Sequence, residues 1–317
     1  MHKGRDAAAD CAGIWKKEET GMKCERGCMR RRSGWGKRLC AAAAALMCLF
    51  LGFSLTEAVA EGASDMQHPE LTVSILKVGK ADAIVVHEEN HAMIIDAGED
   101  EDGVEVVAYL QNHGLESVDV MIITHFDKDH VGGADTVLRG VKVNRVLLPH
   151  YTGEGPEYEE FMEALNACGV KPEYLDAPEA FAFGSASVKV EPPLDYEVKG
   201  KGEVDNNFSL ITTVVHGNCR LLFTGDIEKK RIRAWLEGGT AEPCDFLKIP
   251  HHGSYNSALE QLLDTVRPSI AAICCSAKNP ADQELLDLLA DRGIQTAETT
   301  YGDITVISDG NKVSMYQ

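Results

Sequence analysis

The chain has 317 residues, 44% hydrophobic and 26% charged, so it is long enough for one large domain and is neither disordered nor fibrous in composition. Its formal net charge of −19 is uneven, because residues 1–60 hold 11 Lys/Arg and 6 Asp/Glu and residues 61–317 therefore carry −24. Phosphate affinity comes from cationic side chains, so this acidic body excludes a DNA-coating protein, and stable nucleic-acid binding is not expected.

Residues 1–60 have the order of charges and apolar residues that is typical of an export signal. Five Lys or Arg within residues 30–38 precede an uncharged apolar run at 39–55, and a small-x-small cleavage pattern begins at Ala58. This order predicts a secretory signal peptide, with Met29 as the expected start and a secreted or cell-surface location. The alternative is a retained anchor, because the 17-residue run is just short of a membrane span. Membrane association is expected only if the leader stays uncleaved.

From residue 71 onward, short β-rich runs alternate with helical segments. Apolar runs bounded by turn residues predict strands at 71–78, 83–87, 92–95, 118–123, 143–148, 208–215, 220–223, 246–249, 270–274, 305–308 and 312–315. Helical apolar spacing predicts helices at 103–112, 156–167, 227–236, 257–266 and 282–289. The Pro- and Gly-rich stretch at 177–201 predicts a connector. We therefore expect one α/β (α+β) domain over residues 69–317, with two sheets packed face to face and helices outside.

Four potential metal ligands fall within six residues directly after the buried run at 118–123; they are His125, Asp127, Asp129 and His130. Residues one apart on an extended loop face the same side, so the first three are expected to point together, with His130 offset toward a second ion. Imidazole nitrogen and carboxylate oxygen suit Zn, Fe or Mn. The Gly-Gly pair that follows predicts close backbone packing before the next helix.

Two later segments repeat the layout of an apolar strand followed by a potential ligand. Asp226 follows the run at 220–223, and His251 and His252 follow the run at 246–249. A single His or Asp in a turn is most often solvated or a capping residue. Three strand ends that each carry such residues beside a Gly instead predict a metal site.

The chain resembles the metallo-β-lactamase-fold hydrolases, and among them the branch related to the C-terminal domain of the competence protein ComEC. The residues that carry the resemblance occur in the family's order at 78–83, 95–98, 125–133, 205–210, 223–227 and 248–254. The resemblance implies a four-layer αββα metallo-β-lactamase-like sandwich with a two-metal site at one edge.

Carried over by position, the resemblance implies that His125 binds the first metal. Asp129 and His130 would bind the second metal, and Asp226 would bridge the two. One member of the His251-His252 pair would complete the second site. We expect His251 as the ligand and His252 beside the substrate as a catalytic residue, and the sequence leaves the opposite order open.

The chain departs from the superfamily pattern in the first metal site. Asp127 stands where the pattern has His, which keeps a ligand but favours harder ions such as Mn or Fe. No His occurs between His150 and His216 to complete this site. Asp205 and Asn207 lie in that part of the chain and are expected as helpers.

Two segments that precede the first ligand cluster in the sequence also carry residues considered for the site. Asp96 is expected to support the ligand loops by hydrogen bonding. Lys80 and Asp82 lie in Gly-Lys-Ala-Asp, where the branch usually shows Gly-Gln-Gly-Asp; a turn is expected there, and a role at the site edge is the alternative.

The implied function is a secreted metal-dependent hydrolase with a dinuclear site that cleaves a phosphodiester or phosphoester through a metal-bound hydroxide oriented by Asp129. Two divalent ions are the expected cofactors, with Zn favoured and Mn or Fe as alternatives. The expected partner is a small-molecule or phosphodiester substrate. The alternatives are a lactonase or β-lactamase type of acyl hydrolase and a non-catalytic metal-dependent surface binding module. The sequence leaves the substrate and the oligomeric state open.

Overall fold

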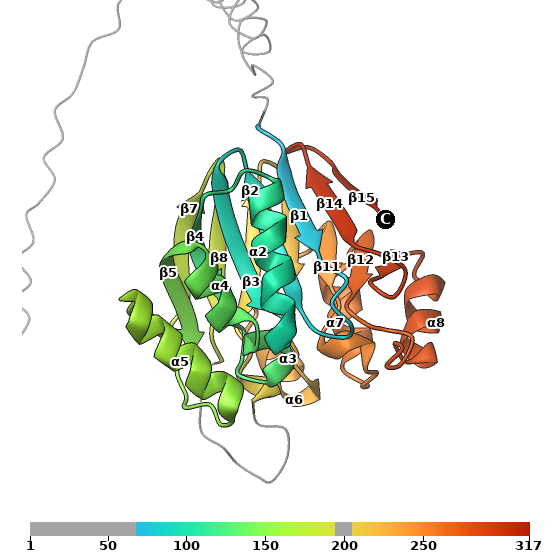
Figure 1. Ribbon diagram of the computed structural model, residues 1–317. Helices are drawn as coiled ribbons and strands as arrows, with labels where there is room; N and C mark the ends of the chain where they lie inside the picture. Colours follow the sequence, from blue (N-terminus) through green and yellow to red (C-terminus); the bar gives the residue numbers. More distant parts are fainter. Residues whose placement is uncertain (1–67, 194–204) are drawn as a thin grey trace, which may run out of the picture. The chain divides into compact units, whose positions relative to one another are not determined.

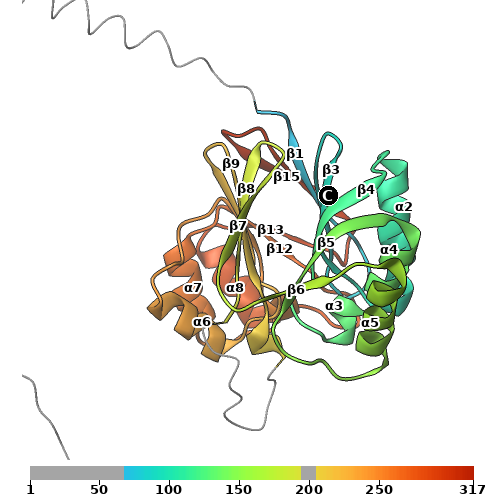
Figure 2. The same cartoon turned by 90° about the vertical axis from the view of Figure 1, so that its left-hand side faces the viewer.

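The computed structural model describes residues 68–193 and 205–317, which form two β-sheets packed face to face between two layers of helices (Figure 1, Figure 2). These residues belong to one compact unit, Met66–Gln317. The αββα sandwich expected from the sequence is therefore confirmed. The leader expected over residues 1–60 lies outside the described residues.

The first sheet has the spatial order β15-β14-β1-β2-β3-β4-β5-β6. Its strands are β1 (Leu71–Ile75), β2 (Ala83–Glu88), β3 (His91–Ala97), β4 (Ser117–Ile122), β5 (Lys142–Pro149), β6 (Pro172–Leu175), β14 (Ile304–Ser308) and β15 (Val313–Tyr316). Strands β3 to β6 run parallel, whereas the pairs from β15 to β3 are antiparallel. Parallel strands are covered on both faces, which explains the continuous buried run at residues 120–123.

The second sheet has the order β13-β12-β11-β10-β9-β8-β7. Its strands are β7 (Glu179–Phe183), β8 (Ala186–Glu191), β9 (Ile211–His216), β10 (Cys219–Phe223), β11 (Phe246–Lys248), β12 (Ile270–Ile273) and β13 (Gln295–Glu298). Strands β10 to β13 run parallel, and β7 to β10 form an antiparallel meander.

Each sheet buries one face against the other sheet and is packed with helices on its opposite face (Figure 2). The first sheet packs against α2 (Gly103–Asn112), α4 (Ala134–Gly140) and α5 (Pro156–Cys168), and the second against α6 (Lys229–Glu237), α7 (Leu259–Val266) and α8 (Gln283–Asp291). Five of these helices lie within two residues of the bounds expected from apolar spacing. The short helix α3 (Lys128–Val131) is not among those expected, and α4 is the helix expected, without bounds, after the Gly-Gly pair.

The expectation of a connector at 177–201 is wrong over its first part. Strands β7 and β8 form an antiparallel hairpin at the edge of the second sheet. Phe183, Val188 and Val190 point into the core between the sheets, and Gly184 turns the chain at a φ of +53°. The glycine therefore marks a hairpin turn between two alternating strands.

The parallel topology brings loops from both sheets to one edge of the sandwich. The carboxyl ends of β3 and β4 meet those of β10 and β11 there, so that the Nε2 atoms of His130 and His252 lie 3.4 Å apart. The potential ligands therefore gather at the strand ends, which is where the loops of parallel sheets position ligands.

None of the helices in the described part of the chain has both the length and the apolar character that crossing a lipid bilayer requires.

Gly133 lets the loop after α3 pass close to the end of β3. A Cβ atom on this residue would lie 2.6 Å from the backbone nitrogen of Gly103 and would overlap the carbonyl oxygen of Ala97. Backbone atoms cannot yield as a flexible side chain can, so any side chain here would force the ligand loop away from β3.

We expect Gly133→Ala to lower the free energy of unfolding by about 1–3 kcal/mol or more, because the added methyl group overlaps backbone on two sides. Gly302→Ala is the matched control, since the nearest atom to its added Cβ is Gln317 Cγ at 3.7 Å. Urea unfolding followed by circular dichroism measures both. Equal midpoints for the two variants would contradict the proposed packing.

Candidate metal centre

Backbone and hydroxyl hydrogen bonds hold the three ligand-bearing loops together. The amide of Leu210, just before β9, donates to the carbonyl of Thr124 at 3.0 Å, which joins the loop after β4 to the second sheet. The Thr224 hydroxyl donates to the carbonyl of Lys248 at 3.0 Å, which joins the loops after β10 and β11. The ligand positions are therefore fixed by the strands that precede them.

Histidine rings converge on Asp226. The potential ligand atoms of His125, His130 and Asp226 lie within 4.8 Å of one another, and all three side chains are buried. Asp226 Oδ2 lies 3.3 Å from His130 Nε2 and 3.0 Å from His252 Nε2. Asp226 therefore occupies the central position expected of a bridging carboxylate.

The Nδ1 atoms of His130 and His125 are hydrogen-bonded to supporting oxygens, and that of His252 lies near a carboxylate. His130 Nδ1 donates to Asp96 Oδ2 at 2.8 Å. The Thr124 hydroxyl donates its proton to the same carboxylate at 2.7 Å. The Thr124 Oγ1 atom therefore accepts the hydrogen bond from His125 Nδ1 at 3.0 Å. His252 Nδ1 lies 3.5 Å from Asp82 Oδ1. This is how metal-binding histidines are commonly oriented, with Nε2 left to bind the ion.

The Nε2 atom of His125 makes no hydrogen bond within residues 68–193 and 205–317, although the ring is completely buried. A buried polar atom without a partner is costly unless a ligand supplies one. The donor set of imidazole nitrogens and carboxylates suits Zn, Fe or Mn. The residues present therefore fit a divalent metal.

Asp127 and Asp129 extend the cluster on two sides. Asp129 Oδ2 lies 3.3 Å from His252 Nε2, and Asp127 Oδ2 lies 3.6 Å from His125 Nε2. The sequence predicts an extended loop here, but the loop is not extended throughout, because α3 begins at Lys128. Asp129 and His130 thus lie in a helical turn.

With His130 and His252 neutral, as metal ligands are, the cluster carries more negative than positive charge. Asp82, Asp129 and Asp226 are buried there, and the lysines that accompany them are Lys80 and Lys248. Excess buried negative charge favours a bound cation.

Burial raises the pKa of a carboxyl, but the opposite charges nearby outweigh that effect here. The neighbouring His252 and His130 hold the pKa of Asp226 well below its ordinary value. Burial lowers the pKa of His252, yet the carboxylates of Asp226 and Asp129 raise it to about 9. A metal ion at His252 Nε2 would displace the proton that the raised pKa favours there, so metal binding competes with protonation of the ring.

The structure places His252, rather than the expected His251, against the cluster. His252 faces the cluster, whereas His251 lies 3.3 Å from Glu228 Oε1 and its side chain is 28% exposed. Both residues have left-handed backbone conformations, with φ values of 49° and 53°. This backbone turn points the two rings in different directions, and residue types alone do not predict it.

The expected helpers take different places. Asp205 lies near Asp127, and burial together with the negative charge of Asp127 raises the pKa of Asp205. Asn207 instead accepts a hydrogen bond from the Arg231 backbone at 3.1 Å, which ties it to α6. Asp96 is fully buried and binds the Thr124 amide at 2.7 Å, so it supports the ligand loop.

Three residues of the cluster are missed or undervalued by the sequence reasoning. Asp82 is buried behind His252 rather than merely part of a turn. Lys248 is fully buried against Asp82, and its position in the apolar run before the His-His pair is the signal that could reveal it. Ser209 lies 3.4 Å from His125 Nδ1 and also accepts from the Asp226 amide at 3.1 Å.

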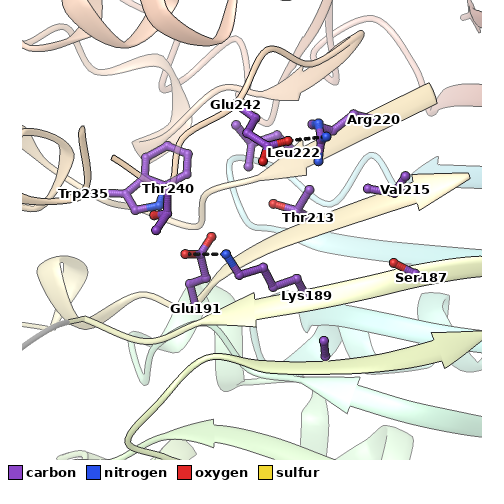
Figure 3. A pocket seen from close by; sticks show the side chains of 11 residues that line it. Ser187, Lys189, Glu191, Thr213, Val215, Arg220, Leu222, Trp235, Thr240 and Glu242 are labelled. Carbon is purple, nitrogen blue, oxygen red and sulfur yellow. Dashed lines mark ion pairs between the residues drawn. The ribbon is translucent and has the colours of Figure 1, made fainter. Parts of the chain in front are cut away.

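A separate cavity of about 230 Å³ lies on the outer face of the second sheet (Figure 3). Two ion pairs line it, Lys189 with Glu191 at 3.0 Å and Arg220 with Glu242. Trp235 on α6 also lines it. None of the candidate metal ligands lines this cavity.

The comparisons with known proteins show the family of the chain. The sequence profile of the Metallo-beta-lactamase superfamily matches residues 76–277, which is more than half of the chain. ComE operon protein 3 of Bacillus subtilis (strain 168) is 27% identical over 61% of this chain and 25% of its own length. Recombination protein 2 of Haemophilus influenzae is 27% identical over 68% of this chain and 25% of its own length. The chain thus spans about a quarter of these relatives, and the resemblance to the ComEC branch is confirmed.

Two solved structures share the fold. The metal-dependent hydrolase Tm1679 of the beta-lactamase superfamily has a TM-score of 0.51 at 12% identity, covering 74% of this chain and 98% of its own. The E377D mutant of the CmlA beta-hydroxylase has a TM-score of 0.51 at 17% identity, covering 75% of this chain and 54% of its own. At these identities the likeness concerns the fold alone.

We expect His252→Ala to weaken Mn²⁺ or Zn²⁺ binding by at least about 100-fold, because a ligand facing Asp226 is lost. His251→Ala is the matched control one residue away and should keep an affinity close to the wild type. Elemental analysis and metal titration of the purified variants measure both. A larger loss in His251→Ala would reverse the assignment of the two rings.

Proposed function

Because the chain belongs to the metallo-beta-lactamase superfamily, we propose that it is a metal-dependent hydrolase of phosphodiesters or phosphoesters with a dinuclear site. The observation that carries the proposal is the convergence of His125, His130 and His252 on Asp226, with the Nδ1 atoms of His125 and His130 hydrogen-bonded to supporting oxygens. This arrangement supports two adjacent ions that share one carboxylate.

The proposed ligands divide into two sets. His125 and Asp127 would hold the first ion, and Asp129, His130 and His252 the second, with Asp226 between them. Bound divalent ions supply an activated water and stabilise the negative charge that develops on the substrate.

The remaining chemistry falls to side chains of the chain itself. Asp129 accepts a hydrogen bond from the attacking water and so orients it. His251 lies at the rim of the centre, where its Nδ1 atom is 3.3 Å from Glu228 Oε1 and its side chain is 28% exposed. His251 therefore takes the place of His252 as the group that protonates the departing alcohol.

The choice of a phosphorus centre is supported by the charge of the site and of the chain. Paired ions neutralise the oxygens of a phosphate ester. The net charge of −24 on residues 61–317 disfavours a long nucleic acid and favours a small or locally bound phosphodiester.

An acyl hydrolase is the second candidate. The hydroxyacylglutathione hydrolase of Aliivibrio salmonicida is 31% identical over 97 residues, which cover 28% of this chain and 37% of that protein. The same fold and metal chemistry can serve a carbonyl centre, so only the substrate that is hydrolysed distinguishes the two candidate functions.

We expect the Mn²⁺- or Zn²⁺-loaded protein to hydrolyse bis(p-nitrophenyl) phosphate, and Asp226→Asn to reduce the rate at least about 100-fold because the shared ligand is weakened. The matched control is Asp119→Asn, which alters another His-paired Asp, bound to His91 at 2.8 Å near the surface. Release of p-nitrophenol, with and without chelator, measures the rate.

Other outcomes of this assay separate the alternatives. Faster turnover of nitrocefin, a lactone or a thioester would replace the proposal with an acyl hydrolase. Bound metal without turnover of any of these substrates would favour the non-catalytic binding module.

We also propose that the protein acts outside the cytoplasm, on the support of the charge and apolar order in residues 30–60. Mass spectrometry of protein collected from the producing cell should find a mature amino terminus just after Ala60. An intact leader in the cytoplasmic fraction would contradict export.

A further inference from the structure

The loop between β1 and β2 reaches the candidate metal centre at two depths. Asp82 is buried behind His252, whereas Lys80, two residues earlier, lies nearer the surface with a side chain that is 39% exposed. The Lys80 ammonium lies 2.7 Å from Asp129 Oδ2. This loop therefore places a partly solvated cation beside a proposed metal ligand.

The two lysines of the cluster differ in what they can contact. Lys248 is completely buried and is paired with Asp82, so no incoming molecule can reach its ammonium without displacing the core. Lys80 combines access to solvent with contact to Asp129. Of these two cations, Lys80 is the one that a substrate can contact.

Metal binding would change the partner of Lys80. The oxygen that it contacts, Asp129 Oδ2, also lies 3.3 Å from His252 Nε2, on the side where the second ion would bind. An ion held by Asp129 would compensate the charge of this carboxylate and weaken its attraction for Lys80. The ammonium of Lys80, with its three N–H donors, would then be available to another anion at the centre.

We propose that Lys80 is a specificity-determining residue that binds a charged oxygen of a phosphate group at the metal-loaded centre. This inference rests on the proposed function and gives its substrate a class, the anionic phosphoester. A lysine ammonium is a compact cation suited to phosphate oxygens, whereas a neutral lactone or ester offers it no charge. Lys80 therefore selects phosphate esters over neutral acyl substrates.

The chain offers a matched control in the cavity of Figure 3. Lys189 has a side chain that is 41% exposed and contacts the buried Glu191 at 3.0 Å, which closely resembles the Lys80 and Asp129 pair. It lines a cavity that includes none of the candidate metal ligands. Lys189→Gln therefore removes an equivalent lysine and an equivalent ion pair outside the centre.

The test compares Lys80→Gln, Lys80→Arg and Lys189→Gln, each loaded with Mn²⁺ and checked for metal content and thermal stability. The first readout is inorganic phosphate binding measured by isothermal titration calorimetry. We expect Lys80→Gln to bind phosphate at least tenfold more weakly, Lys80→Arg to recover part of the affinity, and Lys189→Gln to match the wild type. Unchanged phosphate affinity in Lys80→Gln, or no phosphate binding by the wild type, would overturn the inference.

The second readout compares hydrolysis of bis(p-nitrophenyl) phosphate with that of the neutral ester p-nitrophenyl acetate. Lys80→Gln should raise KM for the phosphodiester and leave any turnover of the acetate unchanged. If the wild type binds phosphate through Lys80 but cleaves no phosphoester, the proposed function fails and the binding role stands. If the wild type cleaves the phosphodiester and Lys80→Gln matches it in both readouts, the role of Lys80 fails and the function stands.

Discussion

The centre depends on burying several carboxylates beside histidines at one edge of the sandwich. Each carboxylate loses hydration on burial, and a charge in that position is stable only when an opposite charge or donors replace the water. Asp96 meets this requirement with the Thr124 amide and hydroxyl and with His130, and Asp82 meets it with Lys248. Asp226 lies among rings whose Nε2 atoms face it, an arrangement that a divalent cation would stabilise.

The topology explains why such a costly arrangement is stable. The loops start from parallel strands whose inner and outer faces are buried, so the strand ends cannot move independently of the core. Hydrogen bonds from Leu210 to Thr124 and from Thr224 to Lys248 connect the two sheets and the two ligand loops of the second sheet. The apolar layers therefore stabilise the like charges that the site brings together.

Residue types and spacing predict the strand ends at which the structure gathers the candidate ligands, because His125 to His130, Asp226 and the His251-His252 pair each follow an apolar strand. They could not distinguish His251 from His252, since that choice depends on two left-handed backbone conformations. Likewise, the burial of Asp82 depends on the path of the loop between β1 and β2, which places this residue beside His252. Periodicity found the long helices, but the β7–β8 hairpin was hidden by the glycine of its turn.

The two halves of the centre are physically unequal. His130 and His252 are buried with Asp129 on one side, whereas the other side has His125 and the carboxylate of Asp127, whose side chain is 44% exposed. A solvated carboxylate binds an ion less strongly than a buried one, because water competes for both partners. In the proposed dinuclear site, the replacement of an imidazole by Asp127 would therefore give the first ion a harder and wetter environment than the second. The open side of the centre is thus the side where the ligand set departs from the superfamily pattern.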